Sequence, residues 1–327
     1  MSGADNAIEV RDLFVGNGDL TAVQGVSFTI PAGGRMGLVG ESGSGKSMTA
    51  LGIMGLLPAG WHVRGSVRHD GVDLVGQSDR QMSKRRGRTI SMVFQDPLSA
   101  LDPVRRVGRQ VTSILRRHLD LSAAEAERQA LDLFAQINLP EPARILRAYP
   151  HELSGGQRQR IMIAMALACY PQLIIADEPT TALDVTVQKQ VLRILDAAVR
   201  ERGSALLMIT HNLPIIAAIC DSVAVMYAGR IVEAGPVAQV FRTPRHRYTQ
   251  GLLRSQPTMD NISFDAGARL PAIPGMVPPL TDLPPGCPFH PRCAAASALC
   301  RTRMPPFEGA PHGAACWHPA DGAGEAP

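Results

Sequence analysis

The sequence lacks the features of a membrane-spanning or secreted chain. Its longest uncharged apolar stretch, from Ile161 to Ala176, has 16 residues, whereas a spanning helix needs about 20. We therefore expect no transmembrane helix. The first ten residues, MSGADNAIEV, have neither the basic start nor the apolar centre of a secretory signal. This pattern predicts a cytosolic chain without structural disulfides.

The chain also has little net charge. Its 33 basic and 29 acidic residues leave a formal charge of +4, so charge alone gives no reason to expect binding to nucleic acid or to an anionic membrane. The 327 residues, 45% of them hydrophobic, are enough to build the core of one large domain or two ordinary ones.

Cysteine and proline are scarce through most of the chain and concentrated at its end. Residues 257–327 hold 14 of the 26 prolines and four of the six cysteines. Because proline removes a backbone donor, we expect this segment to be irregular and to be held together by something other than a strand ladder. The sequence thus divides into a domain over 1–256 and an extension over 257–327. The two other cysteines, Cys169 and Cys220, lie in apolar runs and are expected to be buried.

Before residue 256, short β-branched runs alternate with helical stretches, which predicts an α/β fold with a mainly parallel sheet. The expected strands are Met36–Gly40, Thr89–Phe94, Leu173–Asp177, Ala205–Thr210 and Ser222–Tyr227. A helical block lies between the second and third strands. Within it, Ser122 and Glu125 have the spacing of a capping box and predict a helix start.

A phosphate-binding loop follows the first of these strands. The segment GESGSGKS over 40–47 fits the pattern G-x-x-x-x-G-K-[ST] between a strand and a helix. Its glycines let backbone N–H groups surround an anion, Lys46 adds a positive charge toward the β- and γ-phosphates, and the Ser47 hydroxyl suits Mg²⁺. The residues expected to contact the nucleotide here are Gly40, Glu41, Ser42, Gly43, Ser44, Gly45, Lys46, Ser47 and Met48.

Two adjacent acids end the strand Leu173–Asp177. Asp177 is expected in the magnesium shell, directly or through water, and Glu178 is expected to polarise the attacking water. A solvated turn would also explain two adjacent acids, but the phosphate loop upstream favours the catalytic interpretation.

Further motifs resemble those of the ATP-binding cassette (ABC) ATPases, over residues 7 to about 250. The segment LSGGQ over 153–157 resembles the family's signature sequence, FQD over 94–96 its Q-loop, ALD over 182–184 its D-loop, and THN over 210–212 its switch histidine. This resemblance implies a P-loop NTPase fold with a parallel core sheet, an antiparallel β-subdomain and a helical subdomain at about 96–170.

The resemblance also assigns roles to individual residues. Gln95 would sense the metal and γ-phosphate, and His211 would hold the attacking water with Glu178. The signature residues would contact the ATP of another subunit, because the loop over 40–47 already holds this chain's own nucleotide. Phe14 would either stack on adenine or lie in the core of the β-subdomain. The residues added to the nucleotide site in this way are Phe14, Ser154, Gly155, Gly156, Gln157 and Asp184.

Other segments resemble the branch of dipeptide, oligopeptide, nickel and glutathione importers. They are FQDPLSALDP over 94–103, PHELS over 150–154, GRIVE over 229–233, and the extension segments LPAIPG over 270–275 and GCPFHPRC over 286–293. Membership would imply an ATPase that energises peptide import or, alternatively, nickel or glutathione import. Its partners would be a paralogous or identical ATPase subunit, two transmembrane permeases and, indirectly, a periplasmic or lipid-anchored solute-binding protein. The chain would lie at the cytoplasmic face of the inner membrane.

The extension's cysteines, Cys287, Cys293, Cys300 and Cys316, have the spacing C-x5-C-x6-C-x15-C, which matches neither ferredoxin nor usual zinc-finger patterns. Four thiols in a short proline-rich segment nevertheless suggest a structural four-thiolate metal centre that contributes folding free energy. The resemblance to peptide-importer ATPases implies a [4Fe–4S] cluster. Zn²⁺ and free or oxidised thiols are the alternatives.

Two other function classes agree less well with these motifs. Soluble cassette ATPases that act on nucleic acid or ribosomes usually carry two cassettes or long insertions, whereas this chain has one uninterrupted cassette. P-loop kinases and GTPases lack the LSGGQ signature and the switch histidine. We therefore expect a transporter ATPase with no nucleic-acid partner.

Overall fold

The structure, a computed structural model, describes residues 6–180, 185–256 and 272–320. Its centre is a seven-stranded sheet with the strand order β11-β10-β9-β3-β8-β7-β6. The neighbours from β9 to β6 are parallel, whereas β10 pairs antiparallel with both β9 and β11. The strands are β3 (Arg35–Val39), β6 (Ile90–Val93), β7 (Leu173–Asp177), β8 (Ala205–Ile209), β9 (Ser222–Tyr227), β10 (Arg230–Pro236) and β11 (Gly313–Ala314).

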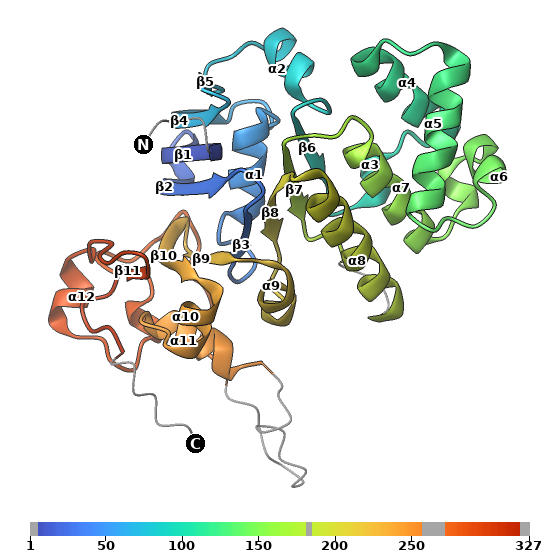
Figure 1. Ribbon diagram of the computed structural model, residues 1–327. Helices are drawn as coiled ribbons and strands as arrows, with labels where there is room; N and C mark the ends of the chain where they lie inside the picture. The colour runs from blue at the N-terminus through green and yellow to red at the C-terminus, as the bar shows by residue number, and fades with distance from the viewer. Residues whose placement is uncertain (1–5, 181–184, 257–271, 321–327) are drawn as a thin grey trace, which may run out of the picture.

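The five strands expected from the sequence are the five parallel strands, so the predicted α/β fold is confirmed. Every residue of β7 and β8 is buried, as expected for parallel strands that are covered on both faces. Alternate residues of these strands enter two different hydrophobic cores. The helices that pack around this sheet are α1 (Lys46–Met54), α8 (Val185–Arg202), α9 (Leu213–Ile219), α10 (Val237–Arg242) and α11 (Arg247–Arg254) (Figure 1).

A second, four-stranded antiparallel sheet with the order β2-β1-β4-β5 packs over α1 and one face of the main sheet. Leu13 and Val15 of β1 are buried in the core that it shares with α1. Its strands are β1 (Asn6–Asn17), β2 (Leu20–Pro31), β4 (His62–His69) and β5 (Val72–Asp73), and helix α2 (Asp79–Arg85) follows it.

The helices between β6 and β7 have a core of their own, and the last of them also packs against the main sheet. Figure 1 shows this group on the side of the molecule away from the C-terminal extension. The helices occupy residues 97–167, within the block predicted from the sequence. They are α3 (Pro97–Ala100), α4 (Val107–Leu119), α5 (Ala123–Gln136), α6 (Pro142–Arg147), the short 3-10 helix η1 (Pro150–Glu152) and α7 (Gly155–Leu167).

The predicted capping box starts α5. The Ser122 hydroxyl accepts a hydrogen bond from the Glu125 backbone N–H at 3.4 Å, and the Glu125 carboxylate accepts one from the Ser122 N–H at 2.9 Å. Ser122→Ala is expected to lower the free energy of unfolding by about 1 kcal/mol, because it leaves a helix N–H without its acceptor. Urea denaturation measures this loss. Ser113→Ala, at an exposed position inside α4, should cause none, and equal losses in both variants would contradict the capping role.

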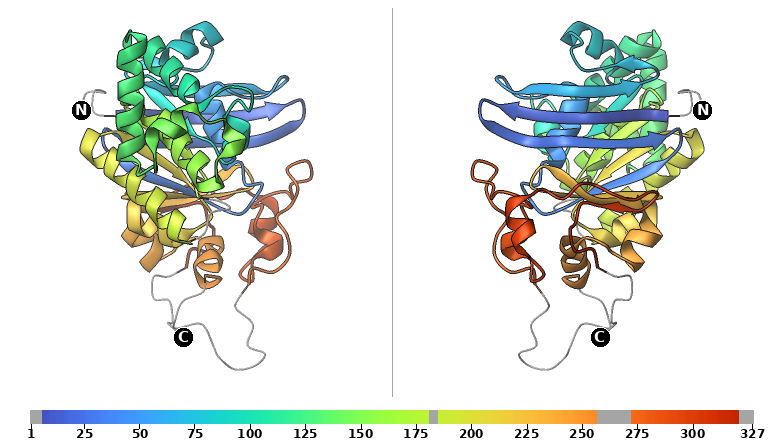
Figure 2. Two further views of the ribbon diagram at one scale, coloured as in Figure 1. Left: turned by 90° about the vertical axis from the view of Figure 1, so that its right-hand side faces the viewer. Right: turned by 90° about the vertical axis from the view of Figure 1, so that its left-hand side faces the viewer.

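The described part of the extension, residues 272–320, lies beside α10 and α11 and is mostly irregular (Figures 1 and 2). It contains the 3-10 helix η2 (His290–Arg292), α12 (Ala298–Thr302) and β11. The expectation that no ladder holds the extension was wrong at one point. Gly313 and Ala314 of β11 pair with Ala234 and Glu233 of β10, because the short run from His312 to Cys316 has no proline to interrupt it.

A buried acid reinforces this junction. The Glu233 carboxylate is fully buried and accepts hydrogen bonds from the backbone N–H groups of Arg245 and His246, at 2.7 and 2.8 Å. The same carboxylate lies 2.6 Å from Nε2 of His312 in the extension. A buried carboxylate needs such partners, so Glu233 fixes the extension against β10 and the start of α11.

Candidate functional site

The loop over 40–45 connects β3 to α1 and has the shape of a cradle. Gly45 adopts a φ of 99°, and a Cβ atom at this position would collide with the Ala22 carbonyl oxygen. A Cβ atom on Gly40 would likewise meet the Met226 carbonyl oxygen. These two glycines are therefore required by close backbone approach, as the sequence pattern indicated.

Lys46 closes the cradle from the first turn of α1. Its Nζ atom donates to the carbonyl oxygens of Gly40 and Glu41, both at 2.9 Å. The side chain is buried, and this burial lowers the pKa of Lys46, while the charges of Glu178, Asp177 and Glu41 act in the opposite direction. A cation held against the loop in this way can bind phosphate oxygens.

Ser47 and Asp177 form a pair of oxygen donors next to Lys46. The Ser47 hydroxyl donates to the Asp177 carboxylate at 3.1 Å, which brings the start of α1 to the end of β7. Asp177 is buried, and burial raises the pKa of its carboxyl group. Mg²⁺ prefers oxygen ligands, is often bound through only one or two carboxylates and keeps several waters. This pair therefore fits the predicted metal position.

The residues predicted to act on water lie together at the carboxyl ends of three neighbouring strands. Gln95 follows β6, Glu178 follows β7 and His211 follows β8. The Gln95 Nε2 atom donates to the Glu178 carboxylate at 3.2 Å, and Nδ1 of His211 lies 3.3 Å from the other Glu178 oxygen. Glu178 adopts a φ of 45°, and its N–H donates to the Ile209 carbonyl oxygen at 2.9 Å.

The signature residues begin α7. Ser154 caps this helix: its hydroxyl accepts from the Gln157 N–H at 3.3 Å, and its own N–H donates to the Gln157 side chain at 2.9 Å. Ser154 and Gly155 are exposed, and a Cβ atom on Gly155 would meet nothing within 4 Å. Among the described residues, no hydrogen bond joins this helix end to the loop over 40–47. Ser154 and Gly155 at the start of α7 therefore lie at the surface of the subunit.

Phe14 lies on β1 with its side chain on the opposite face from Leu13 and Val15. It is half-buried and belongs to neither of the cores that flank the main sheet. The Arg64 guanidinium lies 5.5 Å from the centre of its ring. Adenine stacking and packing within the β-subdomain both stay predictions for Phe14. Asp184, predicted to contact nucleotide, lies outside the described residues.

The four cysteines of the extension line one small, mainly apolar cavity together with His246, Phe289 and Trp317. Burial raises the pKa of the Cys287 thiol to about 11, and it also raises the pKa values of Cys293 and Cys316. Among the described residues, however, no group of three or more His, Cys, Asp or Glu side chains is arranged to hold a metal ion. The predicted metal centre is therefore not confirmed, although the four cysteines line the same cavity. Cys169 and Cys220 are buried elsewhere, as predicted.

One contact of the loop was not expected. The Glu41 side chain, predicted only as part of the phosphate loop, pairs with Arg292 of the extension. The two residues are 251 positions apart, so no local pattern in the sequence could connect them. None of the helices in the described ranges is long and apolar enough to cross a membrane.

Comparisons with known proteins agree with this geometry. The model of the ABC transporter family matches residues 23–181, and the model described as the oligopeptide/dipeptide transporter C-terminal region matches residues 232–300. The oligopeptide transport ATP-binding protein OppD of Salmonella typhimurium is 46% identical over 324 residues, which cover 97% of this chain and 95% of the relative. OppD of Haemophilus influenzae is 45% identical and covers 90% of this chain and 91% of the relative.

A solved structure extends the likeness to three dimensions. The ATP-binding cassette MJ0796, in a dimeric post-hydrolysis state bound to ADP and Pi, is 27% identical with a TM-score of 0.64. The alignment covers 70% of this chain and 98% of the cassette. The relatives match nearly the whole length of this chain, and the cassette shares its fold. This chain therefore belongs to the ABC transporter family.

Proposed function

We propose that this chain is the ATP-binding and ATP-hydrolysing subunit of an importer for di- and oligopeptides. The observation that carries the proposal is the convergence of Gln95, Glu178 and His211 at the sheet edge that also holds Lys46 and the Ser47–Asp177 pair. Both OppD relatives bear names that refer to oligopeptide transport. Nickel and glutathione import are the alternatives within the same branch.

ATP would bind with its phosphates in the loop over 40–48. Backbone N–H groups of the loop and the start of α1 would face the β-phosphate, and Lys46 would exchange its carbonyl partners for β- and γ-phosphate oxygens. Ser47, Asp177 and Gln95 would hold Mg²⁺, which neutralises the developing negative charge when it is bound. Phe14 would stack on adenine after Arg64 moves from the ring face.

Hydrolysis would use the three residues that converge. Glu178 accepts a hydrogen bond from the attacking water, and His211 orients the water and the γ-phosphate. The water oxygen bonds to the γ-phosphorus, the bond to the oxygen bridging the β- and γ-phosphates breaks, and ADP and phosphate are the products. The proton released by the water ends on the phosphate. Gln95 links this step to the helical group, since it lies directly between β6 and α3.

The signature at the start of α7 would complete the ATP site of a second ATPase subunit. Ser154 would offer its hydroxyl, and Gly155 and Gly156 their backbone N–H groups, to the γ-phosphate of ATP bound to the partner. The partner would be a paralogous subunit, arranged head to tail, with ATP between the two chains.

Transport would further require two permeases and, indirectly, a solute-binding protein. The helices over 97–167 are the natural surface for docking to the permeases, because Gln95 connects them to the nucleotide. The subunit would therefore sit on the cytoplasmic face of the inner membrane without crossing it.

Reconstitution tests this assignment. Vesicles containing this subunit, its paralogue and the two permeases should hydrolyse ATP faster when a peptide-loaded binding protein is added, and peptide should accumulate inside. Stimulation by nickel or glutathione alone would transfer the proposal to those substrates. An ATPase stimulated by RNA or ribosomes, and indifferent to the permeases, would contradict an importer role.

We also propose that Cys287, Cys293, Cys300 and Cys316 hold a [4Fe–4S] cluster in a structural role. The cavity that all four line supports this assignment, because four cysteine thiolates are the usual ligands of such a cluster. The cluster would contribute folding free energy to a segment with little regular structure.

Cys287→Ser is expected to remove most of the bound iron and acid-labile sulfide and the visible absorbance of the purified protein, since one of four thiolate ligands is lost. Elemental analysis and absorption spectra measure this change. Cys169→Ala alters a buried cysteine outside the extension and should keep the iron. Zinc in place of iron, or no metal in the unaltered protein, would contradict the cluster.

A further inference from the structure

Arg292 of the extension forms an ion pair with the Glu41 side chain of the phosphate loop. Its Nη1 atom lies 2.6 Å from one Glu41 oxygen, and its Nη2 atom lies 3.0 Å from the other. This two-pronged contact fixes the carboxylate in orientation as well as in position. The pair connects two segments that belong to the opposite ends of the chain.

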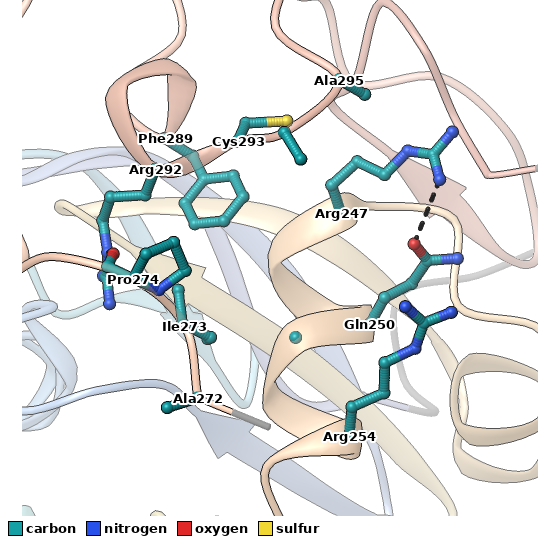
Figure 3. Close-up of a pocket in the computed structure, with 12 residues that line it drawn as sticks. Arg247, Gln250, Arg254, Ala272, Ile273, Pro274, Phe289, Arg292, Cys293 and Ala295 are labelled. Carbon is teal, nitrogen blue, oxygen red and sulfur yellow. Dashed lines mark hydrogen bonds between the residues drawn. The ribbon is translucent and has the colours of Figure 1, made fainter. Parts of the chain in front are cut away.

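Arg292 is itself held firmly. Its side chain is only 5% exposed, and its Nε atom donates to the Pro274 carbonyl oxygen at 2.8 Å. The guanidinium lies about 6 Å from the rings of Tyr227 and Phe289. Figure 3 shows Arg292 beside Phe289 and Pro274 on the wall of a pocket that separates the extension from α11. The arginine therefore acts as a rigid support and not as a mobile surface charge.

Glu41 connects Arg292 to the phosphate loop over 40–47. Its side chain is bound by Arg292, its backbone N–H donates to the Tyr248 hydroxyl at 2.8 Å, and its carbonyl oxygen accepts from Lys46. Three groups of one loop residue are thus engaged, two of them by residues beyond β10. A loop fixed in advance binds phosphate more tightly than one that must first be ordered.

We propose that Arg292 is a positioning residue of the phosphate loop, so that the C-terminal extension and MgATP binding are energetically coupled through Glu41. This inference rests on the proposed role of the loop over 40–47 as the nucleotide cradle. Coupling between two sites is reciprocal. A nucleotide that fixes the loop must therefore also stabilise the extension around Arg292.

Equilibrium binding of MgATP to the full chain tests whether the Arg292–Glu41 contact strengthens nucleotide binding. Arg292→Gln and Glu41→Gln should each raise the Kd about tenfold, near the low end of typical coupling between sites. The double variant should bind no more weakly than either single variant, because both changes remove the same contact. Arg301→Gln removes an exposed arginine of the same extension and should leave the Kd unchanged. Arg292→Lys keeps the positive charge but loses the bidentate guanidinium contact, so this variant should bind MgATP more weakly than the unaltered chain.

Kinetics of the assembled transporter separate positioning from catalysis. In Arg292→Gln, the KM for ATP should rise, while kcat at saturating ATP stays close to that of the unaltered protein. Hydrogen exchange tests whether bound nucleotide stabilises the extension. MgATP should slow the exchange of the backbone amides over 287–300 in the unaltered chain and should not do so in Glu41→Gln. Glu41→Gln changes no residue of the extension, so it tests the coupling even if Arg292 variants fold poorly.

The outcomes are distinguishable. If the unaltered chain does not bind MgATP, the proposed function fails and this inference fails with it. If the unaltered chain binds MgATP and the two single variants bind equally well, the inference alone is overturned. It is also overturned if the losses in the double variant multiply, because Arg292 would then act independently of Glu41 as a stabiliser of the extension.

Discussion

Glu178→Gln is expected to lower ATP turnover about a thousandfold, within the range that a positioned general base contributes, while MgATP binding is kept. The substitution preserves the shape of the side chain but removes the negative charge that accepts a hydrogen bond from the attacking water. Both carboxylate oxygens of Glu178 lie within the converging group, one next to Gln95 and the other next to His211. Phosphate release by the purified subunit pair measures turnover, and a fluorescent ATP analogue measures binding.

A matched control is Glu201→Gln, which removes an acid from the exposed face of α8 and should leave turnover unchanged. Because the γ-phosphate is not cleaved in Glu178→Gln, this variant should also accumulate with its partner in the closed, ATP-bound state. Normal hydrolysis by Glu178→Gln would remove Glu178 from its assigned role.

Lys46→Ala is expected to weaken MgATP binding about 100-fold, which corresponds to the loss of one or two hydrogen bonds to a charged group. The Lys46 Nζ atom is held by the carbonyl groups of Gly40 and Glu41, so the cation lies at the loop that would receive the phosphates. Isothermal titration with MgATP measures the effect.

Lys84→Ala serves as the control, because Lys84 is exposed on α2 and should not contribute to affinity. Retention of full affinity in Lys46→Ala would mean that the backbone of the loop alone binds the nucleotide, and the phosphate role of Lys46 would have to be abandoned.

The parallel core and the converging residues could be predicted because their signals are local. Each parallel strand is a short, continuous apolar run, and Gln95, Glu178 and His211 each follow such a run directly. Since parallel strands place their carboxyl ends at one edge, three separate motifs imply one site. The capping box at Ser122 is likewise contained in four residues.

The antiparallel sheet could not be divided into strands from the sequence. The ladder between β1 and β2 has several register shifts, among them one between Val10 and Leu13. Each shift interrupts the alternation of buried and exposed residues on which strand prediction depends. For this reason the face on which Phe14 lies was open until the structure was known.

The attachment of the extension was also beyond the sequence. Gly313 and Ala314 form a strand that is too short to carry a pattern. The pair of Arg292 with Glu41 depends on how two distant segments fold against α11. The four cysteines predicted a common site through their number, and the structure brings them to one cavity, but number and spacing do not fix the geometry around a metal.

We expect ATP to be held between the loop over 40–47 of one subunit and the start of α7 in its partner. Sedimentation of the Glu178→Gln subunit mixed with its paralogue tests this claim most directly. We predict a 1:1 complex that forms with MgATP and dissociates with MgADP. The complex should not form when Ser154→Ala and Gly155→Trp are combined in this chain and the matching changes are made in the paralogue. Association that is the same with and without MgATP would contradict the account.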